Sequence, residues 1–125
     1  MTRLLLLLVT LLAHSPAPGA QCFVFNNPGE LWAHSDLVFQ GTVVRTKPTG
    51  IQGIHVTVEV ATFRVDKAWK GKPDRVVQVG AEAPFKKNKQ YLVFAAGEPP
   101  STSLPCRWSE LVERAKAKLE WLSRR

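Results

Sequence analysis

Three adjacent residues, His34, Ser35 and Asp36, have the side-chain types of a serine-type catalytic triad. Neighbours in sequence rarely converge on one reacting atom, and no glycines of a nucleophile elbow flank Ser35. We therefore interpret this segment as a helix end followed by a strand start. His34 and His55 lie far apart without the spacing of a zinc site. The pattern favours a non-enzymatic protein with no catalytic residue, no metal and no cofactor.

Basic side chains bracket two expected turns. The chain has 17 Lys and Arg against 10 Asp and Glu, which gives a net charge of +7. A basic domain that also carries aromatic residues can bind a polyanion such as acidic polysaccharide, an anionic surface or nucleic acid. The alternative is a solvated basic surface that aids solubility. The candidate polyanion-binding residues are Lys67, Lys70, Lys72 and Arg75 at the first turn, and Lys86, Lys87 and Lys89 at the second.

Tryptophans supply candidate stacking platforms for such a ligand. We expect Trp69 to be a core residue beneath the first turn, and Trp32 and Trp108 to anchor helices. Trp121 lies beside the apolar stripe of a C-terminal helix, so it is the best candidate for an exposed platform.

Residues 1–20 predict a secretory signal peptide, which leaves 21–125 as one domain. Arg3 supplies the positive start, and the apolar run Leu4 to Leu12 is too short to span a bilayer. No other stretch approaches membrane length, so we expect a secreted, periplasmic or extracellular protein with no transmembrane segment. Export argues against nucleic acid as the physiological ligand.

The chain has two cysteines, Cys22 and Cys106. An oxidising compartment favours their pairing. Such a bridge would close a loop of about 85 residues and stabilise the fold by about 4–5 kcal/mol in the loop-entropy model. The alternative is a pair of free reactive thiols.

The elements that must position these residues are mostly strands. Asn27 predicts the cap of a short helix that ends near His34. Strand patterns cover 36–47, 54–69, 75–80 and 90–95, and a last edge strand is expected near 103–104. Gly41 indicates a bulge or a sharp bend, and the change of apolar parity between Val60 and Ala61 indicates a bulge or a change of sheet face. Long bent strands are typical of small closed barrels.

The last part of the chain predicts a helix capped by Ser109. Its apolar stripe would contain Leu111, Ala115, Leu119 and Leu122. A pair at i and i+4, Glu110 with Arg114, would support the helix on its exposed side.

Three segments together resemble one known family. They are Ser35 to Val44, Phe63 to Gly71 with the turn Trp69-Lys70-Gly71, and Phe85 to Ala95. With a cysteine near each end of the domain, their order is similar to the TIMP-like, netrin-module OB-fold family, over residues 22–122. The resemblance implies a five-stranded Greek-key OB-like barrel with a short N-terminal helix and a C-terminal helix.

The same resemblance implies an interaction module that contacts an extracellular protein, either a metalloproteinase or a surface protein. Its contact edge would be Cys22, Phe23 and Val24. In the metalloproteinase inhibitors the first mature cysteine chelates the zinc of the enzyme, and Cys22 has this role if the mature chain starts there. By its spacing to Asp36, Cys22 matches the second family cysteine equally well, and on that alignment the chelating residue is absent.

Overall fold

The structure, a computed structural model, describes residues 27–53, 56–98, 100–103 and 109–125. Two 12-residue strands, β1 and β2, make up its largest part. In chain order the elements are α1 (Pro28–Ala33), β1 (Leu37–Pro48), β2 (Glu59–Lys70), β3 (Val76–Ala81), β4 (Gln90–Ala96), β5 (Ser101–Ser103), β6 (Glu110–Leu111), the 3-10 turn η2 (Val112–Arg114) and α2 (Lys116–Leu122).

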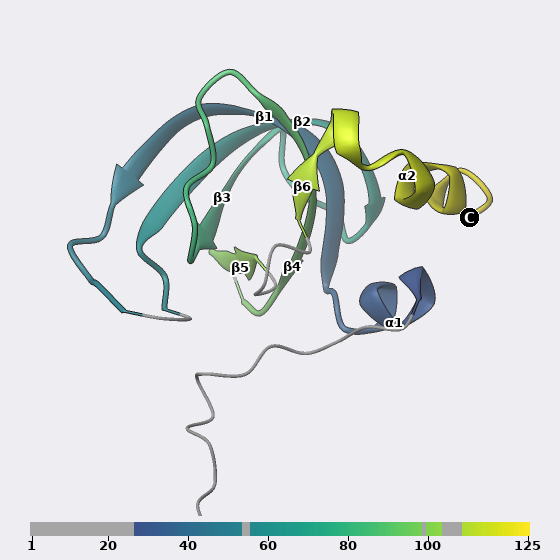
Figure 1. Cartoon of the computed structure of the whole chain (residues 1–125), viewed down its shortest axis with the longest axis horizontal. Coiled ribbons are helices and arrows are strands. Elements are labelled where there is room, and N and C mark those ends of the chain that lie inside the picture. The colour runs from purple at the N-terminus through teal and green to yellow at the C-terminus, as the bar shows by residue number, and fades with distance from the viewer. Residues whose placement is uncertain (1–26, 54–55, 99, 104–108) are drawn as a thin grey trace, which may run out of the picture.

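The first five strands form a closed barrel (Figure 1). Their order is β1-β2-β3-β5-β4, and pairing of β1 with β4 closes the ring. The β3–β5 contact is parallel, and the other contacts in the ring are antiparallel. The short strand β6 adds to the outer edge of β4. The expected OB-like barrel, with a short helix near the N-terminus and a helix at the C-terminus, is confirmed.

The barrel interior is an aromatic core. Phe63 lies at its centre, with ring centroids 5.3 Å from Phe39, 5.1 Å from Phe85 and 6.3 Å from Tyr91. All three pairs meet edge to face, which is a favourable arrangement for aromatic rings. Phe85 comes from the β3–β4 loop, so this loop contributes to the core as well as connecting two strands.

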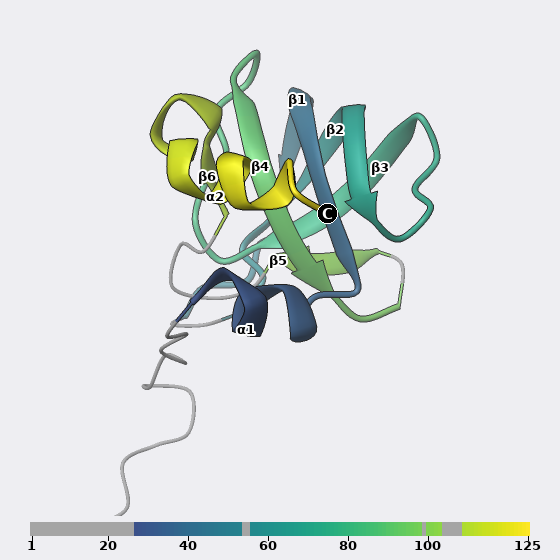
Figure 2. The ribbon, with the colours of Figure 1, turned by 90° about the vertical axis from the view of Figure 1, so that its right-hand side faces the viewer.

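A second core lies outside the barrel, where both helices cover β1 and β4 (Figure 2). Leu92 and Phe94 of β4 and Val38 of β1 pack there with Leu31 of α1 and Leu122 of α2. Strand β4 therefore has its other residues in the barrel core and is buried on both faces, as its apolar sequence predicted. Helix α1 begins as expected, because the side chain of Asn27 accepts a hydrogen bond from the N–H of Glu30.

Register shifts bend the long β1–β2 hairpin. The bulge expected at Gly41 is confirmed by a shift between Gln40 and Gly41. A Cβ at Gly41 would lie 2.9 Å from the carbonyl oxygen of Arg64, so the close approach of the strands requires glycine here. Of the two alternatives for the parity change between Val60 and Ala61, the bulge is excluded, since both residues pair in continuous register with β3. Within the described residues β2 starts only at Glu59, later than its predicted start, so the parity change lies where the strand begins.

The predicted C-terminal helix is wrong in its first half. Ser109 does not cap it, because its hydroxyl accepts from the N–H of Phe94 at 2.9 Å and holds β6 beside β4. Leu111 consequently packs against the barrel core instead of joining the helix stripe. Helix α2 starts only at Lys116. Glu110 pairs with Lys118 at 2.7 Å instead of Arg114, since the chain between them is not one helix.

Candidate functional site

Two of the three triad-type residues, Ser35 and Asp36, form hydrogen bonds with different parts of the fold. The hydroxyl of Ser35 is buried and donates to the carbonyl of Leu31 at 2.7 Å, which ties it to the end of α1. The carboxylate of Asp36 accepts from the N–H of Gly97 at 2.8 Å, across the barrel end. These contacts agree with the interpretation of the segment as a helix end followed by a strand start.

The first group of basic candidates lies on the end of β2 and in the turn that follows. The ammonium of Lys67 lies 5.0 Å from the ring centre of Trp69. Lys70 lies 5.3 Å from the ring centre of Trp32 and donates to its carbonyl at 2.8 Å, so it is half-buried. Lys72 and Arg75 are exposed in the β2–β3 turn. Three of the four side chains therefore extend into solvent with their charge available.

The second group, Lys86, Lys87 and Lys89, lies on the β3–β4 loop and is exposed throughout. Asn88 adopts the left-handed conformation expected for this turn, with φ of 68°. Its N–H donates to the carbonyl of Val43 at 2.8 Å, which fixes the loop against β1. The N–H of Lys86 donates to the hydroxyl of Tyr91 at 2.8 Å. The loop backbone is thus held by the barrel while its three ammonium groups face water.

The pairing of the strands shows how far apart the two basic groups lie. The N–H of Val65 donates to the carbonyl of Arg75, and Val65 pairs with Gly41, which pairs with Tyr91. Arg75 and the start of β4 therefore lie roughly three strand spacings apart, about 14 Å along the barrel surface. The groups flank one outer face without merging.

A polar network that the sequence interpretation missed joins the strands between them. Asp66 is its centre, accepting from Thr42 at 2.9 Å, from Gln90 at 3.1 Å and from Arg64 at 3.3 Å. Partial burial of the Asp66 carboxyl raises its pKa, but the three hydrogen bonds and the Arg64 charge outweigh this, so the pKa is lowered. The network links β1, β2 and β4 and leaves the guanidinium side of Arg64 largely exposed.

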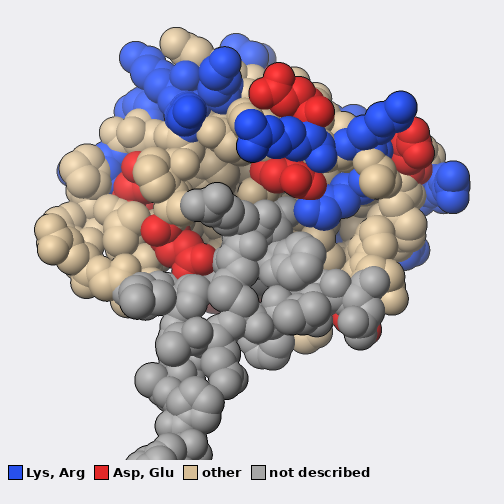
Figure 3. All heavy atoms as spheres, in the orientation of Figure 1, with Lys and Arg blue, Asp and Glu red and all other residues tan. Residues whose placement is uncertain are grey.

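The seven basic candidates take no part in ion pairs with described carboxylates. The ion pairs among the described residues are Arg64 with Asp66 and Lys118 with Glu110. Figure 3 shows a group of basic side chains over the β3–β4 loop, and further basic side chains nearer α2 with acidic side chains between them. The basic surface is therefore uneven, and it has unneutralised positive charge.

The tryptophans contact one another and the chain's own cations. Trp121 is half-buried, so its expected role as an exposed platform is wrong. The guanidinium of Arg125 stacks 4.0 Å from the centre of the Trp121 ring. The ring centres of Trp121 and Trp32 are 6.0 Å apart. Trp32 anchors α1 as expected. Trp69 is half-buried against the core beneath the helices, and Lys67 covers its ring.

Several predicted residues lie outside the described part of the chain. They include the expected contact edge Cys22, Phe23 and Val24, the expected bridge partner Cys106, and Trp108 and His55. Among the residues that the structure describes, no group of three His, Cys, Asp or Glu could hold a metal ion. In the same part of the chain, no helix is long and apolar enough to cross a membrane.

Comparison of the sequence with protein-family models and with curated proteins finds no match.

Proposed function

We propose that this chain is an exported binding module on a TIMP-like, OB-like barrel, and that its basic face binds an acidic polysaccharide. The observation that carries the proposal is the set of basic side chains on two turns, which form no ion pair with described carboxylates and border one face. Unneutralised cations held on a rigid backbone attract an anionic polymer without first breaking internal ion pairs.

The spacing of the two groups favours a polymer over a small anion. The backbones of Arg75 and of the start of β4 lie roughly 14 Å apart along the surface, so one phosphate or sulfate would contact only the nearest side chains of the two groups and leave the other cations without a contact. A chain with anions along its length can contact both at once and gain from multivalency. The polar network centred on Asp66 lies between the two groups and offers polar groups to sugar hydroxyls. Its members are Thr42, Arg64, Asp66 and Gln90.

Charge reversal on one turn tests this function. The probe is dextran sulfate, with uncharged dextran of the same length as the blank. The double variant K86E/K87E should weaken binding at least about tenfold, since two exposed contacts are turned into repulsions. The matched control, K116E/R124E, makes the same change of net charge at exposed positions on and after α2. It should weaken binding by about threefold or less, through the overall field alone.

Equal losses in both double variants would refute a localised site and leave only the general charge of the chain. The competing function is binding to a protein partner, such as inhibition of a metalloproteinase. It predicts that metalloproteinase inhibition depends on the mature N-terminus and is abolished by one extra residue ahead of Cys22. Inhibition of that kind, together with no binding of dextran sulfate, would replace the polysaccharide proposal.

A further inference from the structure

Strand β3 is paired on both sides only along its second half. Strand β2 pairs with it from Val76 to Ala81, whereas β5 pairs with it only at Val79 and Gly80. The first half of β3 therefore has one covered edge and one edge that no described strand covers.

The direction of the free backbone groups follows from the ladder. The bond from the N–H of Val65 to the carbonyl of Arg75 makes these two a hydrogen-bonded pair of the antiparallel ladder. By alternation Val77 directs its peptide groups to β2, and Val76 and Gln78 direct theirs to the opposite side. The open edge thus presents a row of backbone donors and acceptors at strand spacing.

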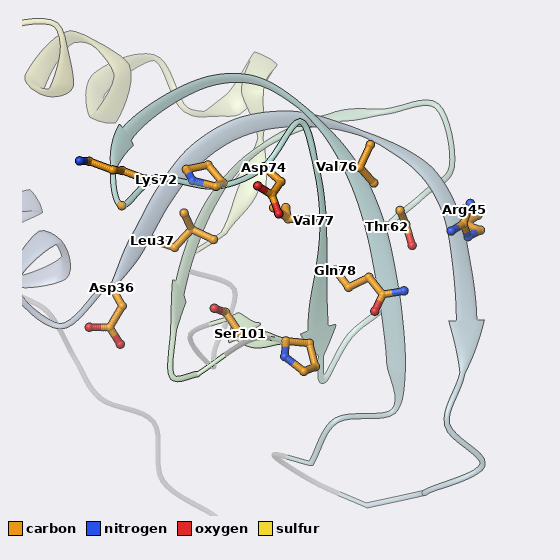
Figure 4. Close-up of a pocket in the computed structure, with 13 residues that line it drawn as sticks. Asp36, Leu37, Arg45, Thr62, Lys72, Asp74, Val76, Val77, Gln78 and Ser101 are labelled. Atoms are coloured by element: carbon orange, nitrogen blue, oxygen red, sulfur yellow. The ribbon is translucent and has the colours of Figure 1, made fainter.

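A cavity of about 660 Å³ lies beside this edge (Figure 4). Leu37, Val77, Pro73 and Pro100 give it apolar walls. Val76, at its margin, is 53% exposed, which is unusual here for a large apolar side chain. Thr62, also in the lining, is only 3% exposed, and its hydroxyl forms no hydrogen bond with another described residue.

The two ends of the cavity differ in charge. Figure 4 places Asp36 at one end and Arg45 at the other, with Asp74 between them and the Lys72 ammonium directed away. Arg45 pairs with Thr62, and Thr62 pairs with Gln78, so Arg45 lies across β2 from the open edge and is too far away to contact a ligand bound there. A ligand along the open edge would instead meet the carboxylate of Asp74, two residues before β3, which fits an extended molecule with a basic group at that end.

We propose that the open half of β3 binds an extended segment of a partner protein by strand addition. Only a peptide in β conformation offers donors and acceptors that match Val76 and Gln78 at strand spacing. Its alternate apolar side chains would enter the cavity between Leu37 and Val77. A basic residue at one end would lie beside Asp74. The site borders the first basic group at Lys72 and Arg75, but it does not depend on polysaccharide binding.

Binding can be measured with capped seven-residue peptides of alternating valine and threonine. One has a lysine at each end, and the other has a glutamate at each end. Added to the ¹⁵N-labelled protein, the lysine peptide should shift the amide signals of residues 76–78. It should bind at least about threefold more tightly than the glutamate peptide, and Asp74→Asn should reduce this preference.

Two changes test the backbone contacts directly. Val76→Pro removes the N–H that faces the open edge and leaves the pairing with β2 intact, so it should fold and bind at least about tenfold more weakly. The matched control Val76→Thr keeps the N–H and should bind within about twofold of the wild type. If Val76→Pro does not fold, the wild-type protein can be tested with a peptide that is N-methylated at its pairing positions. This peptide lacks the N–H groups that would bond to the open edge.

Three results would overturn the proposal. In the first, the peptides leave the signals of residues 76–78 unshifted. In the second, Val76→Pro or the N-methylated peptide binds as tightly as its control. In the third, raising the protein concentration alone shifts these signals, because the edge then belongs to a second copy of this chain.

Discussion

At the residue scale, Asp66 is the hydrogen-bond acceptor that links three strands on the outer face of the barrel. It accepts hydrogen bonds from three residues on three strands, and its lowered pKa reflects them. The sequence did not reveal this role, because its pattern put Asp66 beside a turn, where an acidic residue needs no partner, whereas Asp66 lies within β2. Its contacts depend on the register of β1 with β2, and that register shifts at several points that residue types alone do not fix.

Asp66→Asn should lower the free energy of unfolding by about 1 kcal/mol at neutral pH, since the partly exposed network loses its charged acceptor. The pKa of Asp66 is lowered in the folded state. Its stabilising effect is therefore complete above its ordinary pKa of 3.8 and declines as the pH falls through the folded-state pKa. Urea unfolding at about pH 7 and about pH 3 measures both effects, and the difference between the two proteins should shrink at the lower pH.

The matched control is Asp74→Asn, because Asp74 is exposed and has no hydrogen bond or ion pair in the described part of the chain. Its unfolding free energy should stay within about 0.5 kcal/mol of the wild type. Equal effects of the two substitutions would contradict the role given to the network.

At the element scale, strands were predicted better than the C-terminal helix. The run from Tyr91 to Phe94 is apolar at every position, and only a strand buried on both faces explains it. The spacing from Leu111 to Ala115 is equally compatible with a helix and with a short strand followed by a 3-10 turn. Ser109 decides between them by bonding to Phe94, a contact between residues 15 positions apart that local spacing does not predict.

Helix α2 has seven residues and no side-chain cap, so packing must hold it in place. Leu122 is 1% exposed in the core between the helices and the barrel. Leu122→Ala should therefore lower the unfolding free energy by about 2–4 kcal/mol, measured by urea unfolding followed through tryptophan fluorescence. Lys116→Ala, on the exposed side of the same helix, should change it by about 0.5 kcal/mol or less. A similarly small change in both variants would mean that α2 is not docked.

At the whole-molecule scale, closure of the barrel determines where the charged groups lie. The sequence predicted two basic turns and a barrel, but not the distance between the turns. That distance follows from the strand order β3-β2-β1-β4, in which two strands separate the β2–β3 turn from the start of β4. The turns therefore flank a face instead of forming one cluster, and this geometry is the reason to expect a polymeric ligand.

The central claim is that this face binds an acidic polymer through charge. The most direct test is the affinity of the wild-type chain for dextran sulfate at a series of salt concentrations, by isothermal titration calorimetry. If several exposed cations contact the polymer, log Kd should rise linearly with log salt concentration, and binding should weaken at least about tenfold between about 50 and 300 mM salt. An affinity that stays constant across this range, or equal binding of uncharged dextran, would contradict the claim.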